Sequence, residues 1–200
     1  MQDKKTKDAL AACTTLLRTG GTAVMKQNEI QKLADQAKRH EYDAFTQLMQ
    51  YCMKDMYKTA LAILMNDEDA ADAIQDTILA CWEKLHTLKK TQYFKTWLTR
   101  ILINKCYDIR RIRARLTSLE DYDEPAYENG CNLELKEALA ALDEKYRLVI
   151  LLFYGEGYSV CEIAKLLKIP KSTVTTRLQR GREKLARYYE TSMNGREGLR

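Results

Sequence analysis

Glycine and proline are scarce in this sequence, whose 200 residues hold 8 glycines and 2 prolines. Both residues interrupt helices and mark turns, so their scarcity leaves room for long, unbroken helices. Strict alternation of apolar and polar residues, the pattern of a half-buried strand, is also rare, whereas apolar residues recur at helical spacing over most of the chain. We therefore predict an all-α protein, and its length allows one domain or two.

Clusters of metal-binding residues are absent as well. The sequence contains no CxxC pair, and its two histidines, His40 and His86, stand far apart. A zinc site needs about four ligands close together, so we expect no metal and no cofactor. The six cysteines mostly fall on apolar helix faces, which is typical of reduced thiols in a cytoplasmic protein. They are Cys13, Cys52, Cys81, Cys106, Cys131 and Cys161.

Long apolar runs are missing too. No run approaches the roughly 20 residues that a helix needs to cross a bilayer, so we expect no membrane insertion. The first residues carry charge before the short apolar stretch DALAACTTLL, without a convincing cleavage site, which argues against a secretion signal. The helical pattern begins in MKQNEIQKL, so we expect residues 1–25 to form a disordered N-terminal extension.

The charge that is present divides the chain more clearly than hydrophobicity does. The formal net charge is +5, yet residues 116–135 contain several acidic residues, a proline and a glycine, and no lysine or arginine. Such a stretch favours an exposed linker, whose charge either only keeps it solvated or mimics nucleic acid. We predict this division of the chain: a helical domain over 26–115, a flexible acidic linker over 116–132, a second small helical domain over 133–190, and a tail over 191–200.

The segment GYSVCEIAKLLKIPKSTVTTRLQRGREKL has the layout of two helices joined by a tight turn. Ser159 is a candidate N-cap, and Glu162 three residues later completes a capping box. Pro170 breaks the first helix and leads into a second, for which Ser172 is a candidate N-cap. We therefore predict a helix-turn-helix, a motif whose second helix reads DNA.

The two sides of that second helix differ in character. Val174, Leu178, Gly181 and Leu185 share one narrow sector at about 100° per residue, which predicts the buried side. The hydroxyl and basic side chains broadly opposite suit phosphates, base edges and thymine methyls, so they predict contact with the major groove. An ordinary solvated basic helix would explain the charge, but not the capped helix and Ile-Pro turn before it. The predicted contact residues are Ser172, Thr173, Thr176, Arg177 and Arg180, with Lys184 in the same sector.

A second basic helix is predicted before the linker, in FKTWLTRILINKCYDIRRIR. Residues 100–115 contain six basic residues against the single acid Asp108. Tyr93, Phe94 and Trp97 lie just upstream, and we expect Trp97 in the core. Basic residues beside aromatic ones suit single-stranded DNA, because phosphates attract cations and unstacked bases stack on rings.

The helix predicted over NDEDAADAIQDTILACWEKL is acidic on its outer side. Asn66 is a candidate N-cap, and the three acids after it favour the start of a helix. Asp72, Gln75 and Asp76 lie outside the apolar stripe, and they either add solubility or form a docking surface for a basic protein. The predicted inward stripe is Ala71, Ile74, Ile78, Trp82 and Leu85.

These segments, in this order and across an acidic linker, resemble the extracytoplasmic-function (group 4) family of bacterial sigma factors. The segment DEDAADAIQDTILACWEKL is similar to the family's polymerase-binding segment, and FKTWLTRILINKCYDIRRIR to its promoter-melting and −10-reading helix. The stretch from LDEKYRL to GREKL is similar to its −35-reading domain. Ser172 stands where the family often has glycine and Thr175 where it often has a basic residue, which bears on the −35 preference.

The resemblance implies a role for each predicted site. Asp72, Gln75 and Asp76 would face the clamp coiled coil of the largest polymerase subunit. Lys89 and Lys90, in the loop over residues 86–92, would hold a flipped base of the −10 strand. The five contact residues of the helix-turn-helix would meet the −35 element. The residues along the melted −10 strand would be Arg100, Asn104, Lys105, Asp108 and Arg111, with Asp108 orienting a neighbouring arginine.

The resemblance further implies a non-catalytic subunit that directs core RNA polymerase to promoter DNA, duplex and melted. Its expected partners are the largest and second-largest polymerase subunits and an anti-sigma factor. Two other functions stay open from the residues alone. An autonomous helix-turn-helix regulator would bind duplex DNA without polymerase, and an enzyme acting on nucleic acid would need a catalytic constellation that the sequence does not display.

Overall fold

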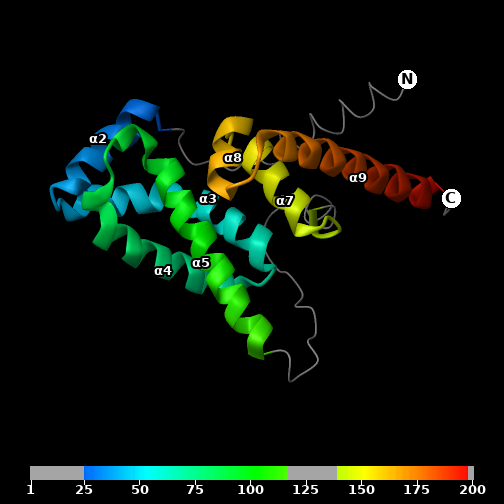
Figure 1. Ribbon diagram of the computed structural model, residues 1–200, viewed down its shortest axis with the longest axis horizontal. Coiled ribbons are helices and arrows are strands. Elements are labelled where there is room, and N and C mark those ends of the chain that lie inside the picture. The colour runs from blue at the N-terminus through cyan, green and yellow to red at the C-terminus, as the bar shows by residue number, and fades with distance from the viewer. Residues whose placement is uncertain (1–24, 117–138, 198–200) are drawn as a thin grey trace. The chain divides into compact units, whose positions relative to one another are not determined.

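The computed structural model describes residues 25–116 and 139–197, which form helices and contain no strand (Figure 1). The segments predicted as the N-terminal extension and the acidic linker, with Cys13 and Cys131, lie outside this range apart from edge residues. The described helices divide into two compact units, one before the linker and one after it. No helix in the described ranges combines the length and the apolar character needed to span a membrane.

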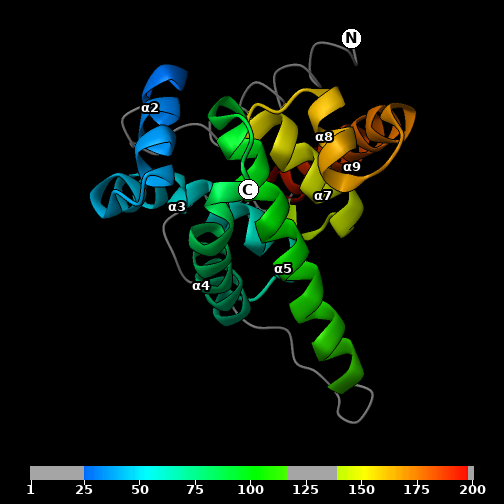
Figure 2. The ribbon, with the colours of Figure 1, turned by 60° about the vertical axis from the view of Figure 1, so that its left-hand side comes forward.

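The first unit is a bundle of four helices. Helix α3 packs against α2, α4 and α5, and α4 and α5 lie side by side, as Figure 2 shows. Two short 3₁₀ turns, η1 and η2, connect α4 to α5. The elements are α2 (Gln27–Lys38), α3 (Tyr42–Leu64), α4 (Asp67–Lys84), η1 (Leu85–Thr87), η2 (Thr91–Tyr93) and α5 (Phe94–Leu116).

The start of α4 is the one that the sequence predicts. The side chain of Asn66 accepts a hydrogen bond from the backbone N–H of Asp69 at 2.9 Å, so Asn66 is the N-cap. Asp67, Glu68 and Asp69 occupy the first turn, where the helix dipole favours negative charge. The preceding helix α3 ends at Leu64, because the next residue, Met65, has a left-handed φ of 54° that stops the helix.

The buried side of α4 differs from the predicted stripe. Ile74 and Leu85 are buried as expected, but Ala71 is exposed. The reason is that α4 packs against both α3 and α5, so its buried sector is wider than a single stripe and is centred differently. Its buried residues are Asp69, Ala70, Ala73, Ile74, Thr77, Ala80 and Cys81.

The second unit contains the predicted helix-turn-helix. Ser159 begins its first helix with the expected capping box: the Ser159 side chain accepts from the N–H of Glu162, and the Ser159 N–H donates to the Glu162 carboxylate at 2.9 Å. Lys168, with a φ of 54°, ends that helix. The elements are α7 (Glu144–Ile150), the π-helical stretch η4 (Leu151–Gly155), α8 (Val160–Leu167) and α9 (Lys171–Glu197).

Both ends of helix α9 differ from the sequence prediction. It begins at Lys171, and the N–H of Val174 donates to the carbonyl of Pro170 at 3.2 Å, so Ser172 lies inside the first turn and is not the N-cap. Proline fixes the backbone angle that a helix start requires, which sets the boundary earlier than the serine would. At its other end α9 continues to Glu197, into the residues that the sequence assigned to a tail.

The predicted buried side of α9 is confirmed. Val174, Leu178 and Leu185 are at most 5% exposed, and Gly181 is buried between them. Gly181 brings α9 close to α7, because a Cβ atom at this position would lie 2.9 Å from Cγ1 of Ile150. This contact holds the opposite, polar face of α9 in a fixed position beside α7.

Candidate nucleic-acid interface

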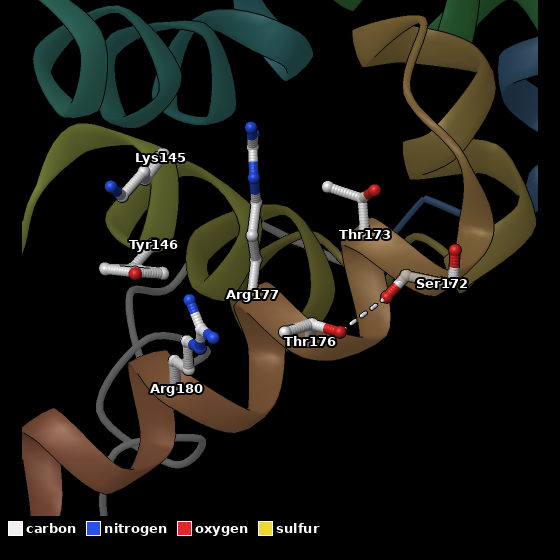
Figure 3. Close-up of a pocket in the computed structure, with 7 residues that line it drawn as sticks. All are labelled: Lys145, Tyr146, Ser172, Thr173, Thr176, Arg177 and Arg180. Atoms are coloured by element: carbon white, nitrogen blue, oxygen red, sulfur yellow. Dashed lines mark hydrogen bonds between the residues drawn. The ribbon is translucent and has the colours of Figure 1, made fainter.

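The five predicted contact residues of α9 line one hollow of about 280 Å³ (Figure 3). Lys145 and Tyr146 of α7 complete its wall, so two helices build the site. Sequence reasoning missed these two residues, because they precede the helix-turn-helix and only the packing of α7 on α9 brings them there. The structure thus brings together the residues that the sequence grouped, and it adds a third basic side chain, Lys145, from another helix.

The polar face of α9 has donors available for a ligand. The hydroxyl of Thr176 donates to the backbone carbonyl of Ser172 at 2.9 Å, which orients the threonine along the helix. Within the described ranges no ion pair engages Arg177 or Arg180, and Arg180 is exposed. A face with hydroxyls and unneutralised guanidinium groups suits an anionic, acceptor-rich ligand such as DNA.

Lys184, predicted in the same sector as the contact residues, does not line the hollow. Its Nζ donates to Oδ2 of Asp143 at 2.6 Å and lies 5.1 Å from the centre of the Tyr146 ring. The hydrogen bond from Lys184 lowers the pKa of Asp143 below its usual value. Because Asp143 immediately precedes α7, the packing of α7 on α9 places this acid within reach of the lysine.

Helix α5 presents the predicted single-strand residues on a largely exposed side. Arg100, Asn104, Asp108 and Arg111 are exposed. The Asp108 carboxylate lies 3.3 Å from Nη2 of Arg111, three residues further along the helix. Both side chains are largely exposed, and the pair leaves the remaining donors of the guanidinium available for phosphate.

Arg113 plays a structural role, although it belongs to the same basic run. Its Nη2 lies 2.7 Å from Oδ1 of Asp69, a residue that is only 7% exposed at the start of α4. Burial raises the pKa of Asp69, and the Arg113 charge opposes that rise. The pair therefore links the end of α5 to the beginning of α4, and counting basic residues could not separate Arg113 from its neighbours.

Two sites that the sequence kept apart meet in the structure. Lys105 of α5, predicted to contact the −10 strand, lies 3.1 Å from the carboxylate of Asp76 on α4. Asp72 and Gln75 are exposed on the same side of α4 as Asp76. Leu79, one turn further along, is 64% exposed and adds an apolar side chain that the sequence prediction did not include.

The loop between α4 and α5 presents Lys89 and Lys90 to solvent. Buried side chains flank the two lysines, because Leu88 is 5% exposed and Thr91 is 7% exposed. The Nζ of Lys38 on α2 donates to the carbonyl of Leu88 at 2.7 Å and holds the loop from outside. The loop is therefore anchored at its base, with two cations at its tip.

The aromatic residues beside that loop divide into buried and exposed. Phe94 is fully buried, whereas Tyr93 is 54% exposed. Trp97, expected in the core, is half-buried, with its ring centre 6.2 Å from that of Phe94. Tyr93, three residues after Lys90, therefore leaves aromatic surface on which a base can stack.

The cysteines of the described ranges are free thiols. Cys52, Cys81 and Cys106 are buried and Cys161 is exposed. Burial raises the pKa values of Cys81 and Cys106 to about 12, so both stay protonated at neutral pH. In the same ranges, no three histidine, cysteine or acidic side chains gather in a metal-binding arrangement.

Family models match both units of the chain. The model of sigma-70 region 2 matches residues 48–116, and the model of sigma-70 region 4 matches residues 132–185. The ECF RNA polymerase sigma factor SigM of Mycobacterium tuberculosis is 31% identical over 160 residues, which span 76% of this chain and 81% of SigM. The ECF sigma factor SigW of Bacillus subtilis is 30% identical over 178 residues, 78% of this chain and 94% of SigW.

Two solved structures are similar in fold. One is CnrH in complex with the cytosolic domain of CnrY, with 28% identity, a TM-score of 0.62, and coverage of 82% of this chain and 98% of the other. The second is RpoE of Bartonella quintana in complex with the anti-sigma factor NepR. It has 25% identity, a TM-score of 0.63, and coverage of 73% of this chain and 96% of the other.

Proposed function

The chain belongs to the extracytoplasmic-function group of the sigma-70 family, and we propose from this membership a division of labour among its helices. It is a sigma factor that directs core RNA polymerase to a set of promoters. The observation that carries the proposal is the hollow on α9 in the unit matched by region 4, where hydroxyl and guanidinium groups face outward together. The chain supplies recognition, and the polymerase supplies the chemistry.

Helix α9 recognises the −35 element as duplex DNA. Thr173, Thr176 and Arg177 would contact base edges in the major groove, and Ser172 and Arg180 would contact the backbone beside it. Their common position around one hollow supports this proposal. Base contacts give selection among sequences, while contacts to phosphate give affinity that falls with salt. The domains over residues 26–115 and 133–190 would thus bind separate promoter elements across the linker at 116–132.

Helix α5 and the loop before it capture the melted −10 strand. Arg100, Asn104 and Arg111 follow the backbone, with Asp108 orienting Arg111. Lys89 and Lys90 hold a flipped base beside exposed aromatic surface. Flipping a base costs a few kcal/mol, and an anchored loop offsets this cost better than a mobile one, because less order must be created on binding.

Helix α4 is the surface for the polymerase. Asp72, Gln75 and Asp76 would meet a basic partner surface on the largest subunit. Lys105 contacts Asp76 in the free chain, so the polymerase-binding and strand-binding sites share one ion pair. An anti-sigma factor is a further proposed partner, supported by the similar sigma factor that was solved with NepR.

Run-off transcription with purified bacterial core polymerase on a fragmented genomic library tests this proposal. We expect new transcripts that share sequence at two upstream positions. The opposite result would be no transcripts, together with binding to duplex DNA that is as tight without polymerase as with it. That result would favour an autonomous helix-turn-helix regulator instead.

The Arg177→Ala variant separates recognition from assembly in the same assay. We expect a loss of −35-dependent transcription of about tenfold, in the range of one base contact, with binding to core polymerase unchanged. Arg187→Ala, further along α9 and outside the hollow, is the matched control and should transcribe like the wild type. Equal loss of transcription and core binding in Arg177→Ala would contradict the assigned role.

A further inference from the structure

The loop between α4 and α5, with two lysines at its tip, is held at both ends by α2. The Nζ of Lys38 donates a hydrogen bond to the backbone carbonyl of Leu88 at 2.7 Å, just before the two lysines. The side-chain Nε2 of Gln27 donates to the backbone carbonyl of Gln92 at 3.0 Å, just after them. These partners are 50 and 65 positions apart in the chain, so both contacts are tertiary anchors and not parts of a local turn.

The two donors lie on the same side of α2 at a spacing that fits the loop. Lys38 comes eleven positions after Gln27, which places the two residues about 20° apart around the helix axis and about 16 Å apart along it. The backbone is extended at Leu88, with ψ 106°, and at Lys90, with ψ 115°. Four extended residues span about 13–14 Å, so the donors match the length of the segment from Leu88 to Gln92.

Helix α2 is itself fixed to the rest of the first unit. It packs against α3, and its residues Ile30, Ala34 and Ala37 are at most 5% exposed. The backbone N–H of Lys26 donates to the carboxylate of Glu29 at 2.9 Å, which holds the first turn of the helix. A loop tied at two points to a packed helix has little freedom left to lose when a ligand binds.

We propose that Gln27 and Lys38 are positioning residues that set the base selectivity of the loop at the flipped −10 base. They act through the backbone of the loop, by fixing the direction from which Lys89 and Lys90 approach the base. Selection among bases needs polar groups in fixed positions, because a mobile ammonium group reaches acceptors on several bases. The inference rests on the proposed capture of the melted −10 strand. It deepens that proposal by giving a task to α2, which precedes the residues 48–116 that match sigma-70 region 2.

The test measures base preference. Single strands with the −10 element of a promoter from the run-off library are prepared with each of the four bases at each position in turn. Their binding to polymerase holoenzyme containing the full chain identifies the position where the wild type discriminates and the double variant Lys89→Ala, Lys90→Ala does not. At that position we expect the preference for the natural base to fall about three- to tenfold in Gln27→Glu and in Lys38→Met, in the range of one hydrogen bond.

Both substitutions remove the donor and nearly keep the size of the side chain. Gln27→Glu leaves only acceptors opposite the carbonyl of Gln92, and Lys38→Met keeps an unbranched stem. Asn28→Asp is the matched control for the added negative charge and Lys32→Met for the lost positive charge, because both native residues are exposed on α2. The two controls should keep the wild-type preference. Lys38→Arg retains a donor and should restore most of it.

The ratio of affinities separates positioning from folding. A fraction of unfolded chain lowers the binding of all four strands alike, so an equal loss for every base would overturn the inference and leave α2 only a structural role. An unchanged preference in either variant, or a matching loss in its charge control, would overturn it as well.

The wild type distinguishes a failure of this inference from a failure of the proposed function. If wild-type holoenzyme shows no base preference at any −10 position, the proposed capture of the strand fails and the role of α2 falls with it. If the wild type discriminates and the variants discriminate equally well, only the role of α2 is wrong.

Discussion

Arg113 and Arg177 both belong to basic runs, yet their surroundings give them different tasks. Arg113 lies 2.7 Å from the buried Asp69, whereas no ion pair within the described ranges engages Arg177 at the hollow of α9. A guanidinium committed to a buried carboxylate is not available for phosphate, because releasing it would leave the acid unpaired. Residue type therefore identifies candidates for DNA contact, and burial of the partner decides among them.

Arg113→Ala should destabilise the first unit in a pH-dependent way. At pH 7 the variant leaves a buried, ionised Asp69 without its cation, which costs about 1–3 kcal/mol of unfolding free energy. Burial already raises the pKa of Asp69, and removal of Arg113 lets it rise further. A group with a raised folded pKa favours folding at low pH, so the difference from the wild type should shrink as the pH falls toward 4.

Urea unfolding from pH 7 to pH 4 measures this difference. Arg111→Ala is the matched control, because its partner Asp108 is exposed and the pair contributes about 0–1 kcal/mol. A constant loss across the pH range would show that Arg113 acts by packing rather than through Asp69.

At the scale of helices, the sequence predicted the starts of α4 and α8 correctly but missed both ends of α9, and it predicted the buried face of α9 better than that of α4. Caps and breakers act over a few residues, so Asn66 and Ser159 start their helices as expected. Faces depend on neighbours that are distant in sequence: the two helices packed on α4 leave Ala71 exposed, and the packing of α7 on α9 brings Lys145 into the hollow. The polar face of α9 was predictable from the sequence, because the helical spacing of Val174, Leu178 and Leu185 already defines the opposite, buried side.

The loop between α4 and α5 is where one hydrogen bond between elements should affect promoter melting. Lys38→Ala removes the donor that holds the carbonyl of Leu88, and the loop with Lys89 and Lys90 gains freedom. Ordering it again on the −10 strand costs affinity, so we expect open-complex formation to fall about three- to tenfold. Fluorescence of a 2-aminopurine in the −10 strand reports opening.

Lys32→Ala, an exposed lysine on the same helix α2, is the control for loss of charge. Core binding should be unchanged in both variants, because Asp72, Gln75 and Asp76 lie on α4. Equal opening rates in Lys38→Ala and the wild type would show that the loop does not need this anchor.

At the scale of the whole chain, the two units have separate hydrophobic cores. One core lies around Phe94 and Leu98, and the other around Val149 and Val174. Each unit carries one proposed recognition surface for promoter DNA, and α4 of the first unit carries the proposed polymerase surface. Damage to the second core should therefore remove −35 recognition without removing assembly with polymerase.

Gly181→Val tests this separation, because the new side chain must enter the space held by Ile150. Overpacking of this kind destabilises a core by about 1–3 kcal/mol, so amide hydrogen exchange should accelerate in α7, α8 and α9. Exchange in α2 to α5 and binding to core polymerase should stay at wild-type levels, while −35-dependent transcription falls. Glu183→Val, on the exposed side of α9, controls for the introduction of a β-branched residue into this helix. Faster exchange in both units would mean that they fold as one cooperative body, and the division of tasks between two independent cores would then be wrong.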